Sequence, residues 1–275
     1  MGIRIITDST SYLPPERLEE YEIEVVPLEI TLGGTRFREG EMSNREYYSR
    51  LRSTSDFPTT SQPPVGDFVK VFERYGPQET YICLVISELL SGTLHAAESA
   101  ASLLPDYDIT VMDSRSTAMG LGFQVLKAAE MGRQGFGRDQ IIQEVVKLRS
   151  EVMIRFVVDN LEYLVRGGRL GKTSGMLGNL LQVKPILGII DGRIDALKKV
   201  RSKRRAVENI VEELKSQVDK GRISEVAVCH ADVESEAMEL KEQVEAFFPK
   251  PILVSEVGPT IGSHTGPGVL GLVYY

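Results

Sequence analysis

Short runs of valine, isoleucine and leucine alternate along this chain with longer segments whose apolar residues recur every three to four positions. Such short runs are typical of buried strands, and they fall at residues 3–6, 23–32, 80–87, 109–112, 155–159, 186–190, 226–230 and 252–256. The longer segments predict amphipathic helices, with apolar stripes at Ile141, Ile142, Val145 and Val146 and at Val207, Ile210, Val211, Leu214 and Val218. Strands and helices that alternate in this way predict an α/β fold with mostly parallel sheets.

The alternation weakens between residues 157 and 192, where glycine is frequent and Lys184-Pro185 interrupts the pattern. Such a segment is typical of a crossover or a connection between domains. A chain of 275 residues is also long enough for two domains, because a domain usually takes about 100–200 residues. We therefore expect two α/β domains, residues 1–150 and residues 151–275.

Composition narrows the classes of function. The net charge of −7 argues against non-specific binding to nucleic acid, which depends on an excess of positive charge. The N-terminus lacks the apolar stretch of a signal peptide, and no window approaches the roughly 20 apolar residues of a membrane span. Cys83 and Cys229 lie in apolar runs without metal-type spacing, which favours a reducing compartment. We expect a cytoplasmic protein without stable membrane insertion.

Loops rich in hydroxyl side chains follow several predicted strands or precede predicted helices. Each loop can be read simply as a helix cap, because Ser, Thr and Asp are the preferred N-cap residues. Ligands of open α/β sheets bind at the carboxyl ends of the strands, however, so that the recurrence of such loops also predicts a polar ligand site. The loops are Thr7-Asp8-Ser9-Thr10-Ser11, Thr59-Thr60-Ser61, Ser91-Gly92-Thr93 and Asp113-Ser114.

His264 is the histidine whose surroundings favour a function, because it lies in the glycine-rich segment 262–268 and loops often carry functional residues. Its local context leaves a structural role equally open, and for His95 and His230 a structural role is expected. A histidine beside hydroxyl groups can serve nucleophilic catalysis, which requires a third group to orient the base. It can also serve as a hydrogen-bond donor to a carboxylate. The sequence shows neither a convincing third group nor a dense acidic cluster for a divalent metal ion.

Residues 198–205 carry six positive charges in eight residues within an otherwise acidic chain. One interpretation is a solvated corner between a strand and a helix. The other is a docking patch for an acidic partner or a phosphate, formed by Lys199, Arg201, Lys203 and Arg204.

Eight short motifs follow one another along the chain. Singly they are weak, but in this order they resemble the DegV family of bacterial fatty acid-binding proteins over essentially the whole chain. The motifs are Thr7-Asp8-Ser9-Thr10-Ser11, Pro27-Leu28, Thr60-Ser61-Gln62-Pro63, Leu90-Ser91-Gly92-Thr93, Asp113-Ser114, Arg166-Gly167-Gly168-Arg169-Leu170, Lys184-Pro185-Ile186-Leu187 and His264-Thr265-Gly266-Pro267-Gly268.

The resemblance implies a long-chain fatty acid in a tunnel between two α/β domains. It further implies a separate ATP-dependent fatty acid kinase, which docks on the basic segment and converts the carboxylate to an acyl phosphate. The chain itself would then be a lipid-binding subunit without a cofactor or metal and not an enzyme. The family usually has serine at the position that matches Ala118. Alanine in this chain weakens any role of the Asp113-Ser114 loop in contact with the head group. The residues implied in ligand binding are Thr60, Ser91, Gly92, Thr93, His264 and Arg169.

Two other functions remain open at this point. The chain can be a stand-alone phosphotransferase or hydrolase that uses Asp8, Ser91 and His264, which predicts turnover by the isolated protein. It can also be a small-molecule sensor without a kinase partner, which predicts ligand binding that does not depend on the basic segment.

Overall fold

The computed structural model describes residues 2–170 and 184–275, and the chain packs as two compact units. The first unit combines the chain up to Glu41 with Thr60–Glu151, and the second combines Met42–Thr59 with Val152–Tyr275. The expected domains, residues 1–150 and 151–275, stay a prediction. Residues 42–59 come from the N-terminal half of the chain but pack with the second unit. Residues 171–183, within the predicted connection, lie outside the described residues.

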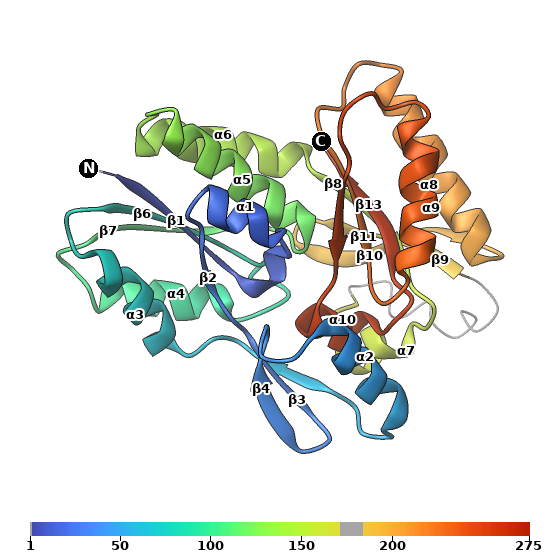
Figure 1. The fold of residues 1–275 in the computed structure, drawn as a ribbon, viewed down its shortest axis with the longest axis horizontal. Helices are drawn as coiled ribbons and strands as arrows, with labels where there is room; N and C mark the ends of the chain where they lie inside the picture. The colour runs from blue at the N-terminus through green and yellow to red at the C-terminus, as the bar shows by residue number, and fades with distance from the viewer. Residues whose placement is uncertain (1, 171–183) are drawn as a thin grey trace. The chain divides into compact units, whose positions relative to one another are not determined.

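The first unit is built on a parallel sheet with the strand order β2-β1-β6-β7 (Figure 1). Helices α3 and α4 cover one face of this sheet, and α5 and α6 cover the other. Parallel strands that are covered on both faces are apolar at nearly every position, and β6 is buried from its second residue onward. The prediction of a parallel α/β sheet is confirmed here. The elements are β1 (Ile3–Asp8), β2 (Glu24–Val26), β6 (Thr80–Val85), β7 (Asp108–Asp113), α3 (Val65–Tyr75), α4 (Thr93–Ser102), α5 (Met119–Arg133) and α6 (Arg138–Glu151).

A small second sheet with the order β4-β3-β5 follows β2. The single strand predicted at residues 23–32 is wrong, because β2 and β3 belong to different sheets. Pro27, which lies between them, has no N–H to donate and breaks the ladder. Gly33 and Gly34 both have positive φ, as the two-residue turn of the β3–β4 hairpin requires. The bounds are β3 (Glu29–Leu32), β4 (Thr35–Arg38) and β5 (Thr59–Ser61), with η1 (Ser9–Ser11) and α1 (Pro15–Glu20) before β2.

The second unit is built on a sheet with the order β10-β9-β8-β13-β11-β12. Only β11 and β12 are parallel among its described ladders, and the other neighbours are antiparallel. The expectation of a mostly parallel sheet is therefore wrong for this unit. The reason is that β13 inserts between β8 and β11, antiparallel to both. The strands are β8 (Met153–Val157), β9 (Lys184–Ile190), β10 (Arg193–Val200), β11 (Val226–His230), β12 (Leu253–Glu256) and β13 (Leu270–Tyr274).

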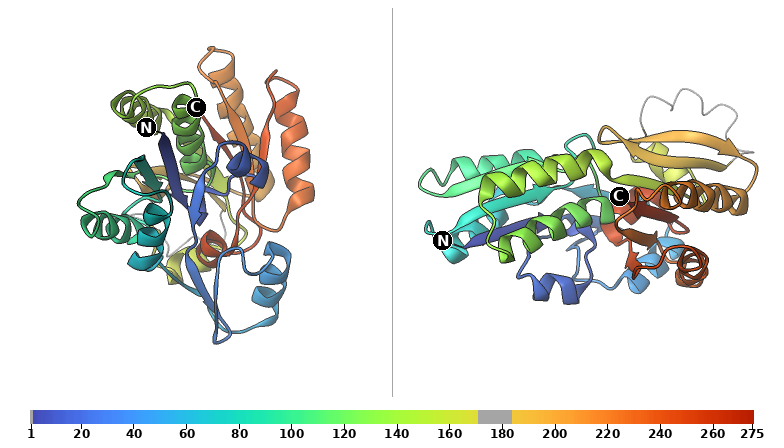
Figure 2. Two further views of the ribbon diagram at one scale, coloured as in Figure 1. Left: turned by 60° about the vertical axis from the view of Figure 1, so that its left-hand side comes forward. Right: turned by 90° about the horizontal axis from the view of Figure 1, so that it is seen from above.

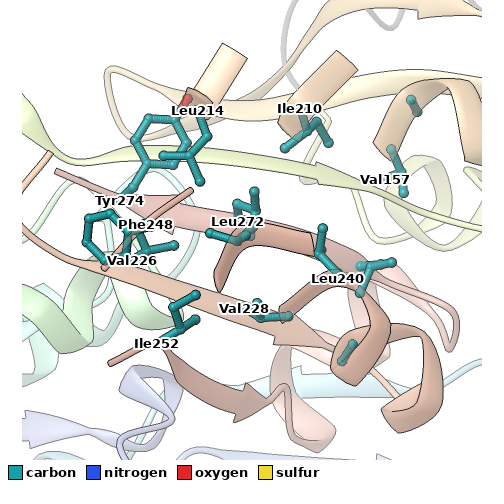
Figure 3. Packing of buried hydrophobic residues seen from close by; sticks show 14 of the residues in the cluster. Val157, Ile210, Leu214, Val226, Val228, Leu240, Phe248, Ile252, Leu272 and Tyr274 are labelled. Atoms are coloured by element: carbon teal, nitrogen blue, oxygen red, sulfur yellow. The ribbon is translucent and has the colours of Figure 1, made fainter. Parts of the chain in front are cut away.

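Helices α8 (Lys203–Val218) and α9 (Glu234–Glu245) pack on this sheet and enclose its apolar core (Figure 3). The stripe predicted for α8 is confirmed, since Ile210 and Leu214 are fully buried against the strands. The helix begins at Ser202, whose Oγ accepts a hydrogen bond of 3.2 Å from the N–H of Arg205. Such an N-cap satisfies one of the unpaired N–H groups of the first turn.

Three short helices complete the second unit: α2 (Asn44–Ser53), α7 (Glu162–Arg166) and α10 (Pro259–Thr265). Although α2 and α10 are more than 200 residues apart in sequence, they lie side by side (Figures 1 and 2). The Tyr47 and Ser263 hydroxyls share a hydrogen bond of 2.8 Å, and the Tyr48 hydroxyl donates to the Val257 carbonyl at 2.7 Å. No helix among the described residues is long and apolar enough to cross a membrane.

Candidate functional site

Ser91 lies in the loop between β6 and α4, at the N-terminus of the helix. Its N–H donates to the Ser87 carbonyl at 3.1 Å, which folds the loop into a tight turn. The Ser91 and Thr93 hydroxyls share a hydrogen bond of 2.9 Å. The N-cap residue is Gly92, which has no side chain with which to cap the first turn. Backbone N–H groups and the positive end of the helix dipole are therefore grouped with two hydroxyls at this point.

Thr60 lies in β5, and its motif is adjacent to the Ser91 motif within the first unit. The contact runs through Gln62, because a Cβ added at Gly92 would collide with the Gln62 carboxamide. Glycine at residue 92 therefore leaves the space in which the two loops meet. Gln62 was not among the predicted site residues. Gln62 belongs to the Thr60-Ser61-Gln62-Pro63 motif, but the sequence of a motif does not show which loop the glutamine side chain contacts.

Asp8 is buried and its carboxylate is engaged by the protein itself. Its Oδ1 accepts hydrogen bonds from the N–H and hydroxyl of Thr10, at 2.8 and 2.6 Å, and Oδ2 accepts from the Ile86 N–H at 2.7 Å. Burial raises the pKa of Asp8, and these hydrogen bonds oppose that rise. Asp8 thus caps η1 and ties the end of β1 to the end of β6, which is the capping role that its loop first suggested.

The Asp113-Ser114 loop is likewise occupied with internal contacts. Asp113 Oδ1 accepts from the Arg115 N–H at 2.8 Å, and the buried Ser114 hydroxyl accepts from the Ser116 N–H at 3.1 Å. Ala118 has φ 48° at the N-cap of α5, a backbone region that L-residues rarely adopt. The weaker head-group role expected of this loop stays a prediction.

His264 lies in α10 of the second unit and is 8% exposed. Its helix begins with Pro259 in the first turn and ends at Gly266, whose φ is 74°. Burial, helped by the positive charge of Arg169, lowers the pKa of His264 to about 4. The imidazole is therefore neutral at pH 7, and one ring nitrogen can donate a hydrogen bond while the other accepts one.

Arg169 is placed by the turn that ends α7. The Gly168 N–H donates to the Val165 carbonyl at 3.1 Å, and the Arg169 N–H donates to the Leu164 carbonyl at 3.3 Å. With φ 69° at Gly168, this is the Schellman pattern, in which a left-handed residue closes the helix. The Arg169 guanidinium folds back and donates to the Gly167 carbonyl at 2.6 Å. Burial lowers the pKa of Arg169.

The sequence profile of the DegV family, whose description is "uncharacterised protein", matches residues 2–275. Protein DegV of Bacillus subtilis is 35% identical over 278 residues, which cover 100% of this chain and 99% of that protein. A DegV domain-containing protein of Listeria monocytogenes is 37% identical over 276 residues, 99% of this chain and 98% of the relative. This chain belongs to the DegV family. The resemblance inferred from the eight motifs is confirmed.

Solved structures of DegV proteins have the same fold. DegV of Bacillus subtilis, described as a fatty acid binding protein, superposes with a TM-score of 0.94 at 35% identity, over 100% of this chain and 99% of that chain. A structure described as fatty acid binding of a DegV family protein from Thermus thermophilus gives 0.92 at 34% identity, with the same coverage. A stearic acid-binding protein from Eubacterium ventriosum gives 0.91 at 28% identity, over 99% and 98%. The α/β fold is confirmed.

The predicted DegV site residues form two groups, one in each unit. Ser91, Gly92 and Thr93 come together in the first unit, where Gln62, two residues after Thr60, contacts Gly92. His264 and Arg169 come together in the second unit. Convergence of both groups on one ligand stays a prediction.

The basic segment spans the end of β10 and the start of α8, so it is a strand-to-helix corner. Lys203 turns inward and pairs with Asp159 and Glu236, both at 3.0 Å. Lys199 and Arg201 are exposed and form no ion pair with any residue that the structure describes. Among the four predicted docking residues, Lys203 therefore already serves the structure of the unit. Arg204 is also paired, with Glu208 at 2.9 Å, but its side chain is 89% exposed.

Proposed function

We propose that this protein binds a long-chain fatty acid in a tunnel between its two domains and presents the carboxylate to a separate ATP-dependent fatty acid kinase. The kinase then forms an acyl phosphate. The observation that supports this most strongly is the similarity, over the whole chain, to solved DegV proteins that are described as fatty acid-binding. Those proteins are described as binding fatty acids, and the kinase step and the tunnel between the domains are part of our proposal.

The head-group site in this proposal uses uncharged donors from Thr60, Ser91 and the first turn of α4, with His264 and Arg169 in support. A carboxylate taken out of water costs several kcal/mol unless it is paired or hydrogen-bonded. Hydroxyl groups and helix N-terminal N–H groups can supply those bonds. Hydroxyls can also turn from a carboxylate to a phosphate, whereas a bidentate arginine would hold the carboxylate in one geometry.

The acyl chain would supply most of the affinity. Burying one CH₂ group is worth about 0.8 kcal/mol, so a chain of about 16 carbons offers on the order of 12 kcal/mol before losses. The ordering of the chain and of the surrounding side chains reduces that gain. Tight binding then does not depend on a strong ion pair at the head group, which leaves the carboxylate available for chemistry.

The geometry of Asp8 disfavours the stand-alone phosphotransferase or hydrolase. Its two carboxylate oxygens accept three hydrogen bonds from Thr10 and Ile86, and the side chain is fully buried. A general base must reach the proton that it abstracts, and this carboxylate would first have to leave its partners. Turnover of an acyl or phosphoryl substrate by the isolated protein would restore that alternative.

Mass spectrometry of the purified protein under native and denaturing conditions tests lipid binding. The expected result is a bound mass in the range of fatty acids with about 14–18 carbons. Thr60→Ala and Ser91→Ala should keep the fold but weaken fatty acid retention, and Ser61→Ala, an exposed neighbour in β5, is the control. If both variants retain fatty acid and are phosphorylated by the kinase as well as the wild type, the assignment of Thr60 and Ser91 to the head-group site is wrong.

The docking role is tested separately on Lys199 and Arg201, the two predicted docking residues that form no ion pair with the residues that the structure describes. Lys199→Glu and Arg201→Glu together should slow phosphorylation by the kinase without changing lipid retention, because exposed charges mainly control the rate of encounter. Lys215→Glu and Lys220→Glu, exposed residues near the other end of α8, are the matched control. Unchanged phosphorylation in the first variant would place the docking surface elsewhere or favour a sensor without a kinase.

A cytoplasmic location and the absence of a nucleic-acid partner belong to the same proposal. The net charge of −7 opposes binding to a polyanion. Cys83 and Cys229 are buried thiols, as expected in a reducing compartment. Burial raises the pKa of Cys83, so this thiol stays protonated at neutral pH.

A further inference from the structure

His264 packs against a residue that has no side chain. A Cβ added at Gly167 would lie 2.5 Å from His264 Nδ1 and 2.8 Å from the Tyr163 carbonyl oxygen. Both separations are far shorter than a normal contact between a carbon and these atoms. Gly167 has φ −71° and ψ −13°, a conformation that every L-residue adopts readily. The backbone dihedral angles therefore do not require glycine here, whereas the His264 imidazole, together with the Tyr163 carbonyl, leaves no room for a methyl group.

We infer that Gly167 is a positioning residue, which lets the His264 ring lie beside Arg169 at the end of α7. This inference rests on the proposed head-group role of His264 and Arg169. The two glycines of the Arg-Gly-Gly-Arg motif then have different roles. Gly168 provides the left-handed turn, with no described atom within 4 Å of its would-be Cβ, and Gly167 provides the space.

Gly167 also holds the side chain of Arg169 in place. Its carbonyl oxygen accepts the 2.6 Å hydrogen bond from Arg169 Nη1, while its Cα faces His264. One residue thus touches both functional side chains, through its backbone in each case. A methyl group at this point would displace the imidazole, distort the turn that carries Arg169, or do both.

The helix that carries His264 has little freedom to retreat from such a methyl group. Gly266, at the end of α10, lies so close to Tyr163 that a Cβ there would lie 2.5 Å from the ring, and Tyr163 itself stacks on Phe57 at 5.5 Å between ring centroids. On the side of α2, the Tyr47 hydroxyl bonds to Ser263 at 2.8 Å. Because α10 is packed against both α7 and α2, the helix cannot move away, and the collision with His264 is relieved by a movement of its side chain.

The ionisation of His264 reports its position. In its buried place beside Arg169 the pKa of the imidazole is lowered from 6.5 to about 4. A ring that turns toward water, or that loses Arg169 as a neighbour, must recover part of its ordinary pKa, because burial and a like charge both disfavour the charged form. A residue that only stabilised the fold would leave this pKa unchanged.

The test is Gly167→Ala in the full chain, with the His264 imidazole titrated by NMR and assigned through its loss in His264→Asn. We expect the His264 pKa to rise toward 6.5 and the affinity for palmitate to fall by about tenfold, the usual effect of losing one hydrogen bond to a charged group. The control is Gly66→Ala in α3, where no described atom lies within 4 Å of the added methyl group. It should change neither quantity.

Reduced thermal stability of Gly167→Ala with an unchanged His264 pKa would reduce Gly167 to a structural role and overturn the inference. If Gly167→Ala fails to fold, the double variant Gly167→Ala with His264→Ala decides. Recovery of folding shows that the collision is with the imidazole, whereas continued misfolding assigns it to the Tyr163 carbonyl and overturns the inference. A wild-type protein that binds no palmitate would refute the proposed function alone, because the NMR titration does not depend on lipid.

Discussion

At the scale of single residues, burial changes the chemistry of Asp8 and His264 in opposite directions. It raises the pKa of the Asp8 carboxyl and lowers that of the His264 imidazole to about 4. Both shifts have the same cause, since an interior poor in water disfavours the charged form of either group. Asp8 offsets the penalty with three internal hydrogen bonds and serves the fold. His264 remains neutral and able to donate or accept a hydrogen bond.

Replacing His264 with asparagine should remove a pH dependence of stability. Between the folded pKa of about 4 and the unfolded value near 6.5, the unfolded chain binds the proton more strongly. The wild-type free energy of unfolding therefore falls as the pH drops through this window, with an His264 contribution of about 2 kcal/mol at pH 5. Urea denaturation at pH 7 and pH 5 checks this, and an equal loss in both proteins would contradict the burial of His264.

Asp8→Asn should destabilise the protein by about 1–3 kcal/mol, because an amide NH₂ would face a buried N–H or hydroxyl donor that now has a carboxylate partner. Chemical denaturation measures the change. Asp106→Asn, at an exposed position, should have little effect. Equal stability of the two variants would mean that the hydrogen bonds to Thr10 and Ile86 contribute nothing to the fold.

At the scale of elements, the apolar stripes indicated helices more reliably than they indicated the buried face. In α8, Ile210 and Leu214 are fully buried as predicted. In α6 the buried set is Ile141, Val145 and Leu148, whereas Val146 is 42% exposed. The spacing i, i+4, i+7 of that buried set is the helical period. A neighbouring apolar residue can still lie on the solvent side.

Leu214→Ala should lower the free energy of unfolding by about 2–5 kcal/mol, since it removes a fully buried side chain and leaves a cavity. Val146→Ala should change it by less than about 0.5 kcal/mol, because that side chain is partly solvated already. Urea denaturation of both variants at pH 7 makes the comparison. Similar losses would show that the exposed edge of α6 packs more tightly than its exposure indicates.

Strands β10 and β13 were not predicted, for different reasons. Strand β10 is an edge strand with exposed lysines, and charged side chains on an edge protect it from pairing with other chains but obscure the strand pattern. Strand β13 follows the glycine-rich segment 262–268, which indicates loops. Its buried Gly271 leaves room for the Arg155 carbonyl of β8, and such close approach of two backbones carries no side-chain signal.

At the scale of the whole molecule, the N-terminal half of the chain contributes to both compact units. Residues 42–59 pack with the second unit, where Tyr47 and Tyr48 of α2 bond to Ser263 and to the Val257 carbonyl. Arg52 of the same helix pairs with Asp232, and Asn44 bonds to Glu256. The α10 helix that carries His264 is therefore supported by a segment from the opposite end of the chain.

Hydrogen exchange of the full chain checks this assignment. In Leu214→Ala, the amides of α2 should lose protection together with those of α8, because elements that pack as one cooperative unit open together. The amides of α5 in the first unit serve as the internal control and should keep theirs. If the α2 amides follow those of α5, residues 42–59 belong energetically to the first unit.

The sequence by itself determined the parallel sheet of the first unit, the amphipathic helices and the polar motifs that hold Thr60, Ser91, Arg169 and His264. Those features follow from side chains and their immediate neighbours, because the period of apolar residues records which face of an element is buried. The resemblance carried by the ordered motifs was enough to indicate the family.

The tertiary structure alone decided the antiparallel order of the second sheet, the packing of residues 42–59 with it, and the contact of Gly167 with His264. Strand direction and strand order depend on backbone hydrogen bonds between distant segments, which no side-chain pattern encodes. Whether a glycine is needed for the space that it leaves depends on which other segment of the chain packs there. For Gly167 that segment is the imidazole of a helix about a hundred residues further along the chain.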